Sequence, residues 1–423
     1  MKILVIGSGG REHAVILKLR ESEKKPEIFC TPGNGGISRF AKCFDVKVND
    51  KEGLVALAKE IGADLVVVTP EEPLALGVAD ALEAAGIKAF GPSAAAALIE
   101  ASKVFSKNLM KKYGIPTARY ETFSEAGAAK AYLKAQNDYP TVIKADGLAA
   151  GKGVIIAENE AQAYAAIEDI LENDKFGRSG SQVVIEEFLT GPEVSVLAFV
   201  DGETVRPLVS SMDHKRIGEG DTGLNTGGMG TIAPNPYYTE AAAKECFEKI
   251  FIPTAKAMCA EGKPFRGLLY FGLMLTKNGA KVIEYNCRFG DPETQVVLPL
   301  LDGDLCDIMT AIADGKLAET HFGVKDGAAA CVIISSGGYP EKYETGFPVN
   351  GLDSNGQAEG ITVYHAGTSY KDGRFLSSGG RVLGLTAAGE NLAAALEKCY
   401  AAAEKINFEG SYFRKDIGGR KYD

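Results

Sequence analysis

The chain has 423 residues, of which 45% are hydrophobic and 24% charged, and its net charge is −10. This length exceeds one hydrophobic core, and the negative charge disfavours nucleic acid and anionic membranes as partners. The eight cysteines form no CxxC pair or zinc-type spacing and no apolar run is long enough to span a membrane, so a zinc cage and a membrane protein are excluded and a reducing cytoplasm is expected.

Residues 1–101 alternate between strand and helix patterns. The run KILVIG at residues 2–7 is a short buried strand, and glycines follow it directly. This alternation predicts a doubly wound parallel sheet, in which ligands bind at the carboxyl ends of the strands. The predicted strands cover residues 2–7, 26–31, 64–69 and 88–91, and the predicted helices cover residues 12–21, 52–61 and 75–85.

The first strand leads into the turn GSGGREH at residues 7–13, whose backbone amides could approach an anion. The turn is not the dinucleotide fingerprint, because Glu12 occupies the third glycine position and the second strand ends in TPGNGG where an acid is usual. We therefore expect a phosphorylated small molecule here, with plain strand-to-helix turns as the alternative. The expected phosphate contacts are Gly9, Gly10, Arg11, Asn34 and Gly35.

Residues 102–120 are expected to be a connection, formed by one amphipathic basic helix that ends at Gly114. The lysines at positions 107, 111 and 112 are best explained as a solvated face. Lys103 differs, because it follows the edge of the first sheet and could face a nucleotide.

Residues 121–190 predict a small α/β unit built around a hairpin. Strand patterns at residues 141–144 and 154–157 flank the loop ADGLAAGKG, whose small residues let backbone N–H groups approach phosphates. The loop is not a Walker P-loop, since no Ser or Thr follows Lys152 and a strand stands where a helix is required. We therefore expect the hairpin to cover a nucleotide, with positive charge from Lys144 and Lys152.

The strand pattern at residues 182–189 extends this nucleotide site. Its end could meet an adenine through backbone groups, and Glu193 could reach ribose hydroxyls, although a single glutamate is more often simply solvated. The nucleotide contacts expected from the whole region are Lys103, Lys144, Gly151, Lys152, Gly153, Glu186, Glu187, Phe188, Leu189 and Glu193.

Residues 213–230 are rich in glycine and charge and lack periodicity, which predicts a long functional loop without regular elements. The alternative is that His214 and Lys215 are ordinary surface residues. A helix at 240–260 and a strand at 267–275 follow. Residues 326–423 predict an α+β cap of strands and a helix at 391–406. In this cap His365 is expected to be structural, and Arg414 and Lys415 could face the cleft that the cap shares with the rest of the chain.

The segment VIEYNCRFGDPETQ at residues 282–295 concentrates charge at the end of a predicted strand. The period of two places Glu284 and Asn286 on one face, where a carboxylate and an amide oxygen suit Mg²⁺. Arg288 adds a fixed cation, and the following turn brings Asp291 and Glu293 close. A core strand that ends in a polar turn is the alternative reading.

Four features, taken in chain order, resemble ATP-grasp ligases. They are the strand that carries Lys144, the glycine-rich hairpin, the strand with the sequence IEEF at 185–188, and the strand with the pattern ExN formed by Glu284 and Asn286. More narrowly, the chain resembles the phosphoribosylamine–glycine ligase family of purine biosynthesis over its full length. Leu224 stands where that family usually has proline. Many ATP-grasp relatives also carry an acid on the strand before ExN, where this chain has Gly272, so Glu284 and Asn286 are the expected metal ligands. The motifs are GSGGREHA, PGNGG, KADGLAAGKGV, IEEFLTGPEVS, DHKRIGEGDTGLNTGGMG, EYNCRFGDPETQ, HAGT, GGRVLG and YFRKDIG.

The resemblance implies an ADP-forming ligase that uses ATP and Mg²⁺ or Mn²⁺. The carboxylate of glycine would attack the γ-phosphate to give glycyl phosphate, and the amine of 5-phosphoribosylamine would then displace phosphate. We expect Arg288 and Asp291 to hold the reacting glycine and stabilise charge, with Asp213 and Lys215 close by. The rival interpretations are a carboxylate–amine ligase of the same fold with another acceptor, and a nucleotide sensor without catalysis.

The expected architecture is α/β and α+β, in several domains, and the expected assembly state is a monomer. The domains are an N-terminal substrate-phosphate domain at 1–101, a connection at 102–120, an ATP-grasp lid at 121–190, a catalytic domain at 191–325 and a C-terminal α+β domain at 326–423.

Overall fold

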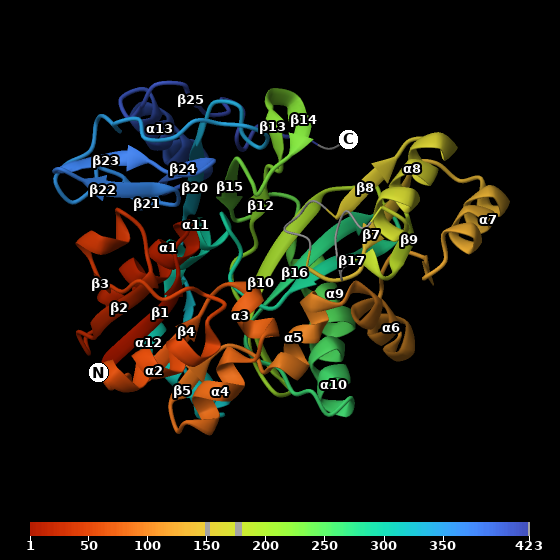
Figure 1. Cartoon of the computed structure of the whole chain (residues 1–423), viewed down its shortest axis with the longest axis horizontal. Helices are drawn as coiled ribbons and strands as arrows, with labels where there is room; N and C mark the ends of the chain where they lie inside the picture. Colours follow the sequence, from red (N-terminus) through yellow and green to blue (C-terminus); the bar gives the residue numbers. More distant parts are fainter. Residues whose placement is uncertain (149–152, 174–179, 422–423) are drawn as a thin grey trace.

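The computed structural model describes residues 1–148, 153–173 and 180–421. Its N-terminal part is a parallel sheet with strand order β3-β2-β1-β4-β5, which confirms the predicted doubly wound arrangement (Figure 1). Residues 3–6 of β1 are fully buried, as expected for a parallel strand with helices on both faces. The elements are β1 (Lys2–Gly7), α1 (Gly10–Arg20), β2 (Glu27–Pro32), β3 (Lys42–Cys43), α2 (Lys51–Ile61), β4 (Leu65–Val68), α3 (Glu71–Ala75), α4 (Val78–Ala84) and β5 (Lys88–Phe90).

Helices α5 (Ala94–Ala101) and α6 (Lys103–Tyr113) connect this sheet to the rest of the chain. Ser102 caps α6, because its Oγ accepts a hydrogen bond from the Phe105 N–H at 3.0 Å. Gly114 ends the helix with φ of 69°, a left-handed conformation that favours glycine. The predicted basic helix is therefore confirmed.

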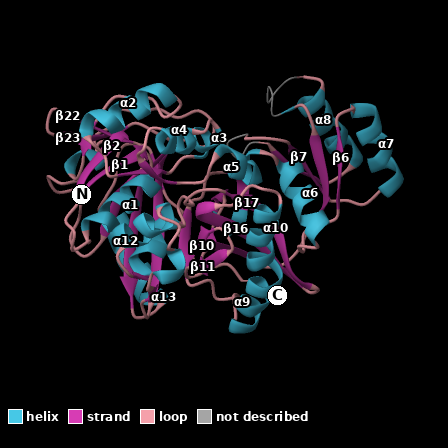
Figure 2. Cartoon of the chain, turned by 90° about the horizontal axis from the view of Figure 1, so that it is seen from below, coloured by secondary structure: helices cyan, strands magenta, loops and turns pink. Residues whose placement is uncertain are grey.

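The lid lies at one end of the molecule, away from the N-terminal sheet (Figures 1 and 2). Its sheet has the order β6-β9-β7-β8, and β7 and β8 form the predicted antiparallel hairpin with Lys144 opposite Val154. The predicted nucleotide contacts Gly151 and Lys152 at the hairpin tip lie outside the described residues. The elements are β6 (Tyr120–Phe123), α7 (Ala126–Gln136), β7 (Thr141–Ala145), β8 (Val154–Ala157), α8 (Glu160–Leu171) and β9 (Val183–Glu187).

A central antiparallel sheet, ordered β11-β10-β16-β17, carries the ExN segment. Gly272 pairs with Glu284 and Leu273 pairs with Val282, so Ile283 is an extra residue in a β-bulge just before the ExN positions. Buried Tyr285 separates the partly exposed Glu284 and Asn286, in keeping with their shared face. The elements of this region are β10 (Glu193–Asp201), β11 (Thr204–Pro207), α9 (Glu240–Cys246), α10 (Ile252–Ala260), β16 (Arg266–Thr276), β17 (Gly279–Asn286), α11 (Thr294–Val297), β18 (Leu301–Asp302), α12 (Leu305–Ala313) and β19 (Gly323–Val324).

The C-terminal sheet has the order β12-β15-β20-β24-β21, and β25 also pairs with β20. It incorporates β12 and β15 from the region around residues 213–230, so this region joins the central and C-terminal parts. The elements are β12 (Met212–Asp213), β15 (Gly230–Ala233), β20 (Ala328–Ser336), β21 (Thr362–His365), β22 (Thr368–Lys371), β23 (Arg374–Ser377), β24 (Arg381–Gly389), α13 (Leu392–Ala403) and β25 (Ser411–Tyr412).

The prediction that residues 213–230 lack regular elements is wrong. Strands β13 (Arg216–Gly218) and β14 (Thr222–Asn225) pair as a short hairpin. The hairpin is fixed from outside, because the buried Arg414 guanidinium donates to the Arg216 carbonyl at 2.9 Å and pairs with Asp221 at 3.0 Å. Such a tertiary tie leaves no periodic pattern in the sequence.

No helix in the described part of the chain is long and apolar enough to cross a membrane.

Candidate active site

Glu284 lies at the centre of a group of positive charges. Burial raises its pKa, but Lys215, Lys144 and Lys103 outweigh burial and lower the pKa below its ordinary value. Glu284 is therefore an ionised carboxylate at neutral pH. Asn286 donates its Nδ2 to the Tyr285 carbonyl at 2.8 Å, which fixes the amide and leaves its oxygen as the acceptor. A carboxylate and an amide oxygen fit a hard divalent cation.

Two predicted nucleotide lysines lie on neighbouring elements near this carboxylate. Lys103 donates to the Gly147 carbonyl at 2.7 Å, and Lys144 donates to the Ile283 carbonyl at 3.1 Å. Lys144 also pairs with Glu186 at 3.0 Å. The structure therefore brings the start of α6, the lid hairpin and the ExN strand together.

Lys107 was expected on a solvated face, and that prediction is wrong. Its side chain is 3% exposed, pairs with Glu186 at 3.0 Å and donates to Thr117 at 2.8 Å. Burial lowers the pKa of Lys107 to about 8, although Glu186 acts in the opposite direction. The error arises because the partner carboxylate lies on a strand distant in sequence.

Three of the remaining predicted nucleotide residues, Glu187, Phe188 and Leu189, lie at the end of β9 or directly after it. Glu187 pairs with Lys281 at 2.7 Å and with Arg119 at 3.0 Å, so its carboxylate serves the protein itself. Phe188 is exposed, Leu189 is partly exposed, and Gly153 is buried at the end of the hairpin loop.

An acidic cavity adjoins Glu284. Its lining includes Glu193, Ser195, Asp213, Lys215 and Tyr270. Asp213 is 9% exposed, and its Oδ1 has no hydrogen-bond partner among the described residues. Burial, followed by Glu293, raises the pKa of Asp213 well above its ordinary value. A buried carboxyl oxygen of this kind can accept a hydrogen bond from a ligand.

Lys215 is the cation of this cavity. It pairs with Glu193 at 3.4 Å, and that carboxylate raises the lysine's pKa above its ordinary value. His214 next to it is fully buried, which excludes the alternative of a surface residue for this histidine. Its Nε2 accepts a hydrogen bond from the Gly418 N–H at 3.0 Å.

Arg288 is held between two carboxylates of the N-terminal part. Its Nε donates to Glu71 at 3.1 Å, and its guanidinium pairs with Glu100 at 3.3 Å. Burial raises the pKa of Glu71, but Arg288 and Arg11 outweigh it and lower the value to about 2. Arg288 is thus a fixed cation, two residues beyond Asn286.

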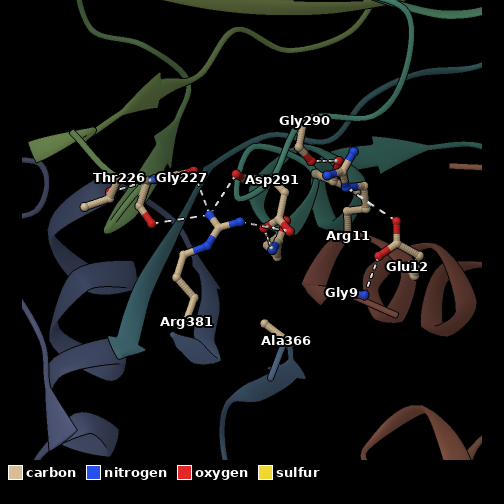
Figure 3. Close-up of polar contacts among 12 residues, drawn as sticks. Gly9, Arg11, Glu12, Thr226, Gly227, Gly290, Asp291, Ala366 and Arg381 are labelled. Carbon is tan, nitrogen blue, oxygen red and sulfur yellow. Dashed lines mark hydrogen bonds and ion pairs between the residues drawn. The ribbon is translucent and has the colours of Figure 1, made fainter. Parts of the chain in front are cut away.

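Asp291 faces a C-terminal arginine. The Arg381 guanidinium pairs with the Asp291 carboxylate at 3.2 Å and donates to the Asp291 carbonyl at 2.9 Å (Figure 3). Gln295 donates to the other side of the carboxylate at 2.8 Å. Burial raises the pKa of Asp291, but Arg381 and then Arg11 outweigh burial and lower it. Asp291 is therefore ionised.

A side chain of helix α1 fills the turn that leads into this helix. The Gly9 N–H donates to the Glu12 carboxylate at 2.5 Å, and Glu12 fills the space beside Gly7 (Figure 3). Arg11 reaches across the domain boundary and donates to the Phe289 carbonyl at 3.1 Å. Gly10 lies opposite Gln295 and Asp291, so the turn contacts the 288–295 segment directly.

The PGNGG loop at residues 32–36 packs on the C-terminal domain. Asn34 donates to the carbonyls of Ser8 at 2.8 Å and His365 at 2.7 Å, and the Gly35 N–H donates to the Thr368 carbonyl at 2.8 Å. A Cβ on Gly36 would overlap the His365 ring. These donors therefore serve domain packing in this structure.

Several residues of the site were missed by sequence reasoning. Glu71 is the first residue of α3, in the Pro-Glu-Glu-Pro stretch after β4, and its position after a strand was the available signal. Glu100 and Arg381 gave no local signal beyond an ordinary helix and a GGRVLG motif. Their roles come from contacts between distant segments.

Three parts of the chain match the phosphoribosylglycinamide synthetase family, namely its N domain at residues 1–100, its ATP-grasp (A) domain at 101–294 and its C domain at 329–420. A phosphoribosylamine–glycine ligase from Caldanaerobacter subterraneus is 48% identical over 417 residues, which cover 99% of each protein.

Solved structures agree. A phosphoribosylamine–glycine ligase from Thermotoga maritima has a TM-score of 0.85 and 33% identity, with 99% of this chain and 100% of that chain covered. A biotin carboxylase from Campylobacter jejuni is 17% identical and has a TM-score of 0.77, with 100% and 97% covered, and shares the fold. The sequence resemblance is thus confirmed, and the chain belongs to the phosphoribosylglycinamide synthetase family, with its ATP-grasp domain between the N and C domains.

Proposed function

We propose that this chain joins glycine to 5-phosphoribosylamine at the expense of ATP, giving glycinamide ribonucleotide, ADP and phosphate in purine biosynthesis. Full-length similarity to proteins named phosphoribosylamine–glycine ligase supports these two substrates. The observation that carries the reaction type is the ionised Glu284 among Lys103, Lys144 and Lys215. Beside it lies the cavity lined by Asp213, whose Oδ1 has no hydrogen-bond partner in the part of the chain that the structure describes. Lysines around a metal-binding carboxylate suit phosphoryl transfer.

ATP would lie between the lid hairpin and the central sheet. Lys103 and Lys144 would contact its phosphates, together with the hairpin residues Gly151, Lys152 and Gly153. The end of β9 and the two residues after it, Glu186 to Leu189, would meet the adenine through backbone groups, and Glu193 would reach the ribose. Glu284 and Asn286 would hold Mg²⁺ or Mn²⁺, which would supply positive charge against the negative charge that develops during phosphoryl transfer.

Glycine would occupy the cavity beside Glu284. Its ammonium group would donate to Asp213, whose Oδ1 has no protein partner among the described residues. Its carboxylate would lie toward Lys215 and the fixed Arg288 cation, which stabilises the developing negative charge. Gly272, which also lines this cavity, packs against Glu284, since a Cβ added at Gly272 would lie 3.1 Å from Glu284 Cγ.

5-Phosphoribosylamine would bind between the first turn and the C-terminal domain. Arg11 and the Gly10 amide are the phosphate contacts that we retain, because the Arg11 guanidinium has N–H donors besides the Nη1 that donates to the Thr69 and Phe289 carbonyls. The donors of Gly9, Asn34 and Gly35 already serve protein acceptors, so a direct phosphate contact from them would require those bonds to open.

The reaction would run in two steps. A carboxylate oxygen of glycine attacks the γ-phosphorus, and the bond from that phosphorus to the β–γ bridging oxygen breaks, giving glycyl phosphate and ADP. The amine nitrogen then attacks the glycyl carbon, and the carbon–oxygen bond breaks to release phosphate. The amine nitrogen loses one proton, which leaves with the released phosphate, and the ionised Asp291 beside the first turn would accept a hydrogen bond from the amine.

The domain division at residues 101, 120, 190 and 325 is part of the proposal, as are a monomeric state and a cytoplasmic location. The family matches, whose parts run from 1 to 100, 101 to 294 and 329 to 420, support the outer boundaries.

The direct test is ADP release by the purified chain with ATP, Mg²⁺, glycine and 5-phosphoribosylamine generated from ribose 5-phosphate and ammonia. The proposal requires release that depends on both substrates. Release with glycine and a different amine alone would favour another carboxylate–amine ligase, and ATP binding without release would favour a nucleotide sensor.

A further inference from the structure

Arg381, the first residue of β24, connects the C-terminal domain to two other parts of the chain. Its Nη1 donates to the Gly227 carbonyl at 2.7 Å and to the Asp291 carbonyl at 2.9 Å, with a longer contact of 3.4 Å to the Gly228 carbonyl. Its Nη2 pairs with the Asp291 carboxylate at 3.2 Å. Figure 3 shows the guanidinium between Gly227 and Asp291. One planar group therefore fixes two separate segments.

On one side of Arg381, Asp291 lies next to the first turn of the N-terminal sheet, where 5-phosphoribosylamine is proposed to bind. A Cβ added at Gly9 would lie 3.4 Å from Asp291 Oδ2, and one added at Gly10 would lie 3.6 Å from Oδ1. The carboxylate thus separates Arg381 from the first turn of the N-terminal sheet. Any shift of Asp291 would change the wall against which a ligand at this turn rests.

On the other side, the Gly227–Gly228 turn leads from Arg381 to the glycine half. A Cβ added at Gly227 would lie 2.9 Å from Arg381 Cζ, and one added at Gly228 would lie 2.5 Å from Asp213 Oδ1. The turn is therefore packed between the guanidinium and the carboxyl that lines the cavity. Asp291 therefore lies between Arg381 and the proposed amine position, and the Gly227–Gly228 turn lies between Arg381 and the proposed glycine position.

We propose that Arg381 is a positioning residue that holds Asp291 and the Gly227–Gly228 turn together and so aligns the bound amine with the activated glycine. The inference rests on the proposed function. The guanidinium suits the task because its planar fork serves a carboxylate and several carbonyls at once, whereas a lysine ammonium is a single point charge on a flexible stem. Misplacement by about 1 Å costs roughly 10²-fold in rate.

The test compares Arg381→Lys and Arg381→Met with the wild type in steady-state kinetics for all three substrates. Arg206→Lys is the matched control, because Arg206 likewise donates to two carbonyls, those of Thr320 at 3.0 Å and Phe322 at 3.2 Å, outside the described site. We expect Arg381→Lys to lower kcat/KM for 5-phosphoribosylamine by about 10²-fold, with KM for glycine and ATP changed less than about threefold. The control variant Arg206→Lys should keep the wild-type kcat/KM for all three substrates.

A second measurement separates positioning from stability. Arg381→Met leaves a buried carboxylate unpaired and can impair folding, so the melting temperature of each variant is measured beside its kinetics. Arg381→Lys, which keeps the positive charge, should keep the melting temperature of the wild type and still show the low kcat/KM for the amine. Equal losses for all substrates, or full activity of Arg381→Lys, would overturn the proposal. Wild-type ADP release that needs no amine would instead reject the proposed function.

Discussion

Arg288 illustrates how one side chain can be both a structural and a chemical group. Its pairing with Glu71 and Glu100 fixes the guanidinium before any substrate binds, which is the condition for preorganised charge stabilisation. We predict that Arg288→Ala lowers kcat by about 10² to 10³-fold. Arg206→Ala, which also removes an arginine bound to backbone carbonyls, should retain full kcat. A loss smaller than tenfold in Arg288→Ala, measured by ADP release, would contradict this role.

Glu284 is the other residue whose charge the site controls. Replacement by Gln keeps the shape and removes the carboxylate that three lysines hold ionised. We predict that Glu284→Gln raises the Mg²⁺ concentration for half-maximal activity by more than about tenfold, since changes even in the surroundings of metal ligands have effects of that size. Glu240→Gln, at an exposed helix start, is the control. An unchanged Mg²⁺ titration would remove Glu284 from the metal site.

At the scale of elements, the PGNGG loop explains how the first and last domains fit together. Gly36 has an ordinary φ of −75°, so glycine is needed there for space and not for backbone conformation. We predict that Gly36→Ala destabilises the fold by about 1–3 kcal/mol, because the new methyl overlaps His365. Gly127→Ala in α7, where a Cβ meets no other atom, should be neutral or stabilising. Urea unfolding of both variants measures the difference, and equal effects would contradict the packing argument.

The same contact makes domain packing sensitive to acid. His365 is fully buried, and burial lowers its pKa to about 4 from the usual 6.5. Between these values the unfolded chain binds more protons than the folded chain, so the free energy of unfolding should fall as the pH drops from 6.5 to 4. In His365→Gln this fall should be smaller by about 3 kcal/mol. The control is the exposed His321→Gln, which should keep the wild-type slope; the same slope in His365→Gln would refute the assignment.

At the scale of the whole molecule, the sequence predicted what depends on local pattern. Buried strands such as 2–7, the lid hairpin and the ExN strand follow from periodicity and turn residues, and the structure has all of them. It did not predict contacts between distant segments. Lys107 is indistinguishable from its solvated neighbours Lys111 and Lys112 until Glu186 is placed beside it, and the glycines of PGNGG suggest a phosphate loop until the C-terminal domain covers them.

The domains also meet at the proposed reaction centre. The lid and central sheet supply the lysines and Glu284, the N-terminal domain supplies Arg11 and Glu71, and the C-terminal domain supplies Arg381. No one of them holds the full set of groups that the proposed chemistry uses. We therefore predict that glycine activation and amine capture occur in one continuous cleft.

The most direct test of the proposed reaction traces the carboxylate oxygen atoms of glycine. With both carboxylate oxygens of glycine labelled with ¹⁸O, attack on the γ-phosphorus followed by displacement must transfer one labelled oxygen to phosphate in each turnover. Mass spectrometry of the phosphate should therefore show a single ¹⁸O, and glycinamide ribonucleotide should keep the other. Unlabelled phosphate would mean that water, and not glycine, accepts the phosphoryl group, and would contradict the proposed function at its centre.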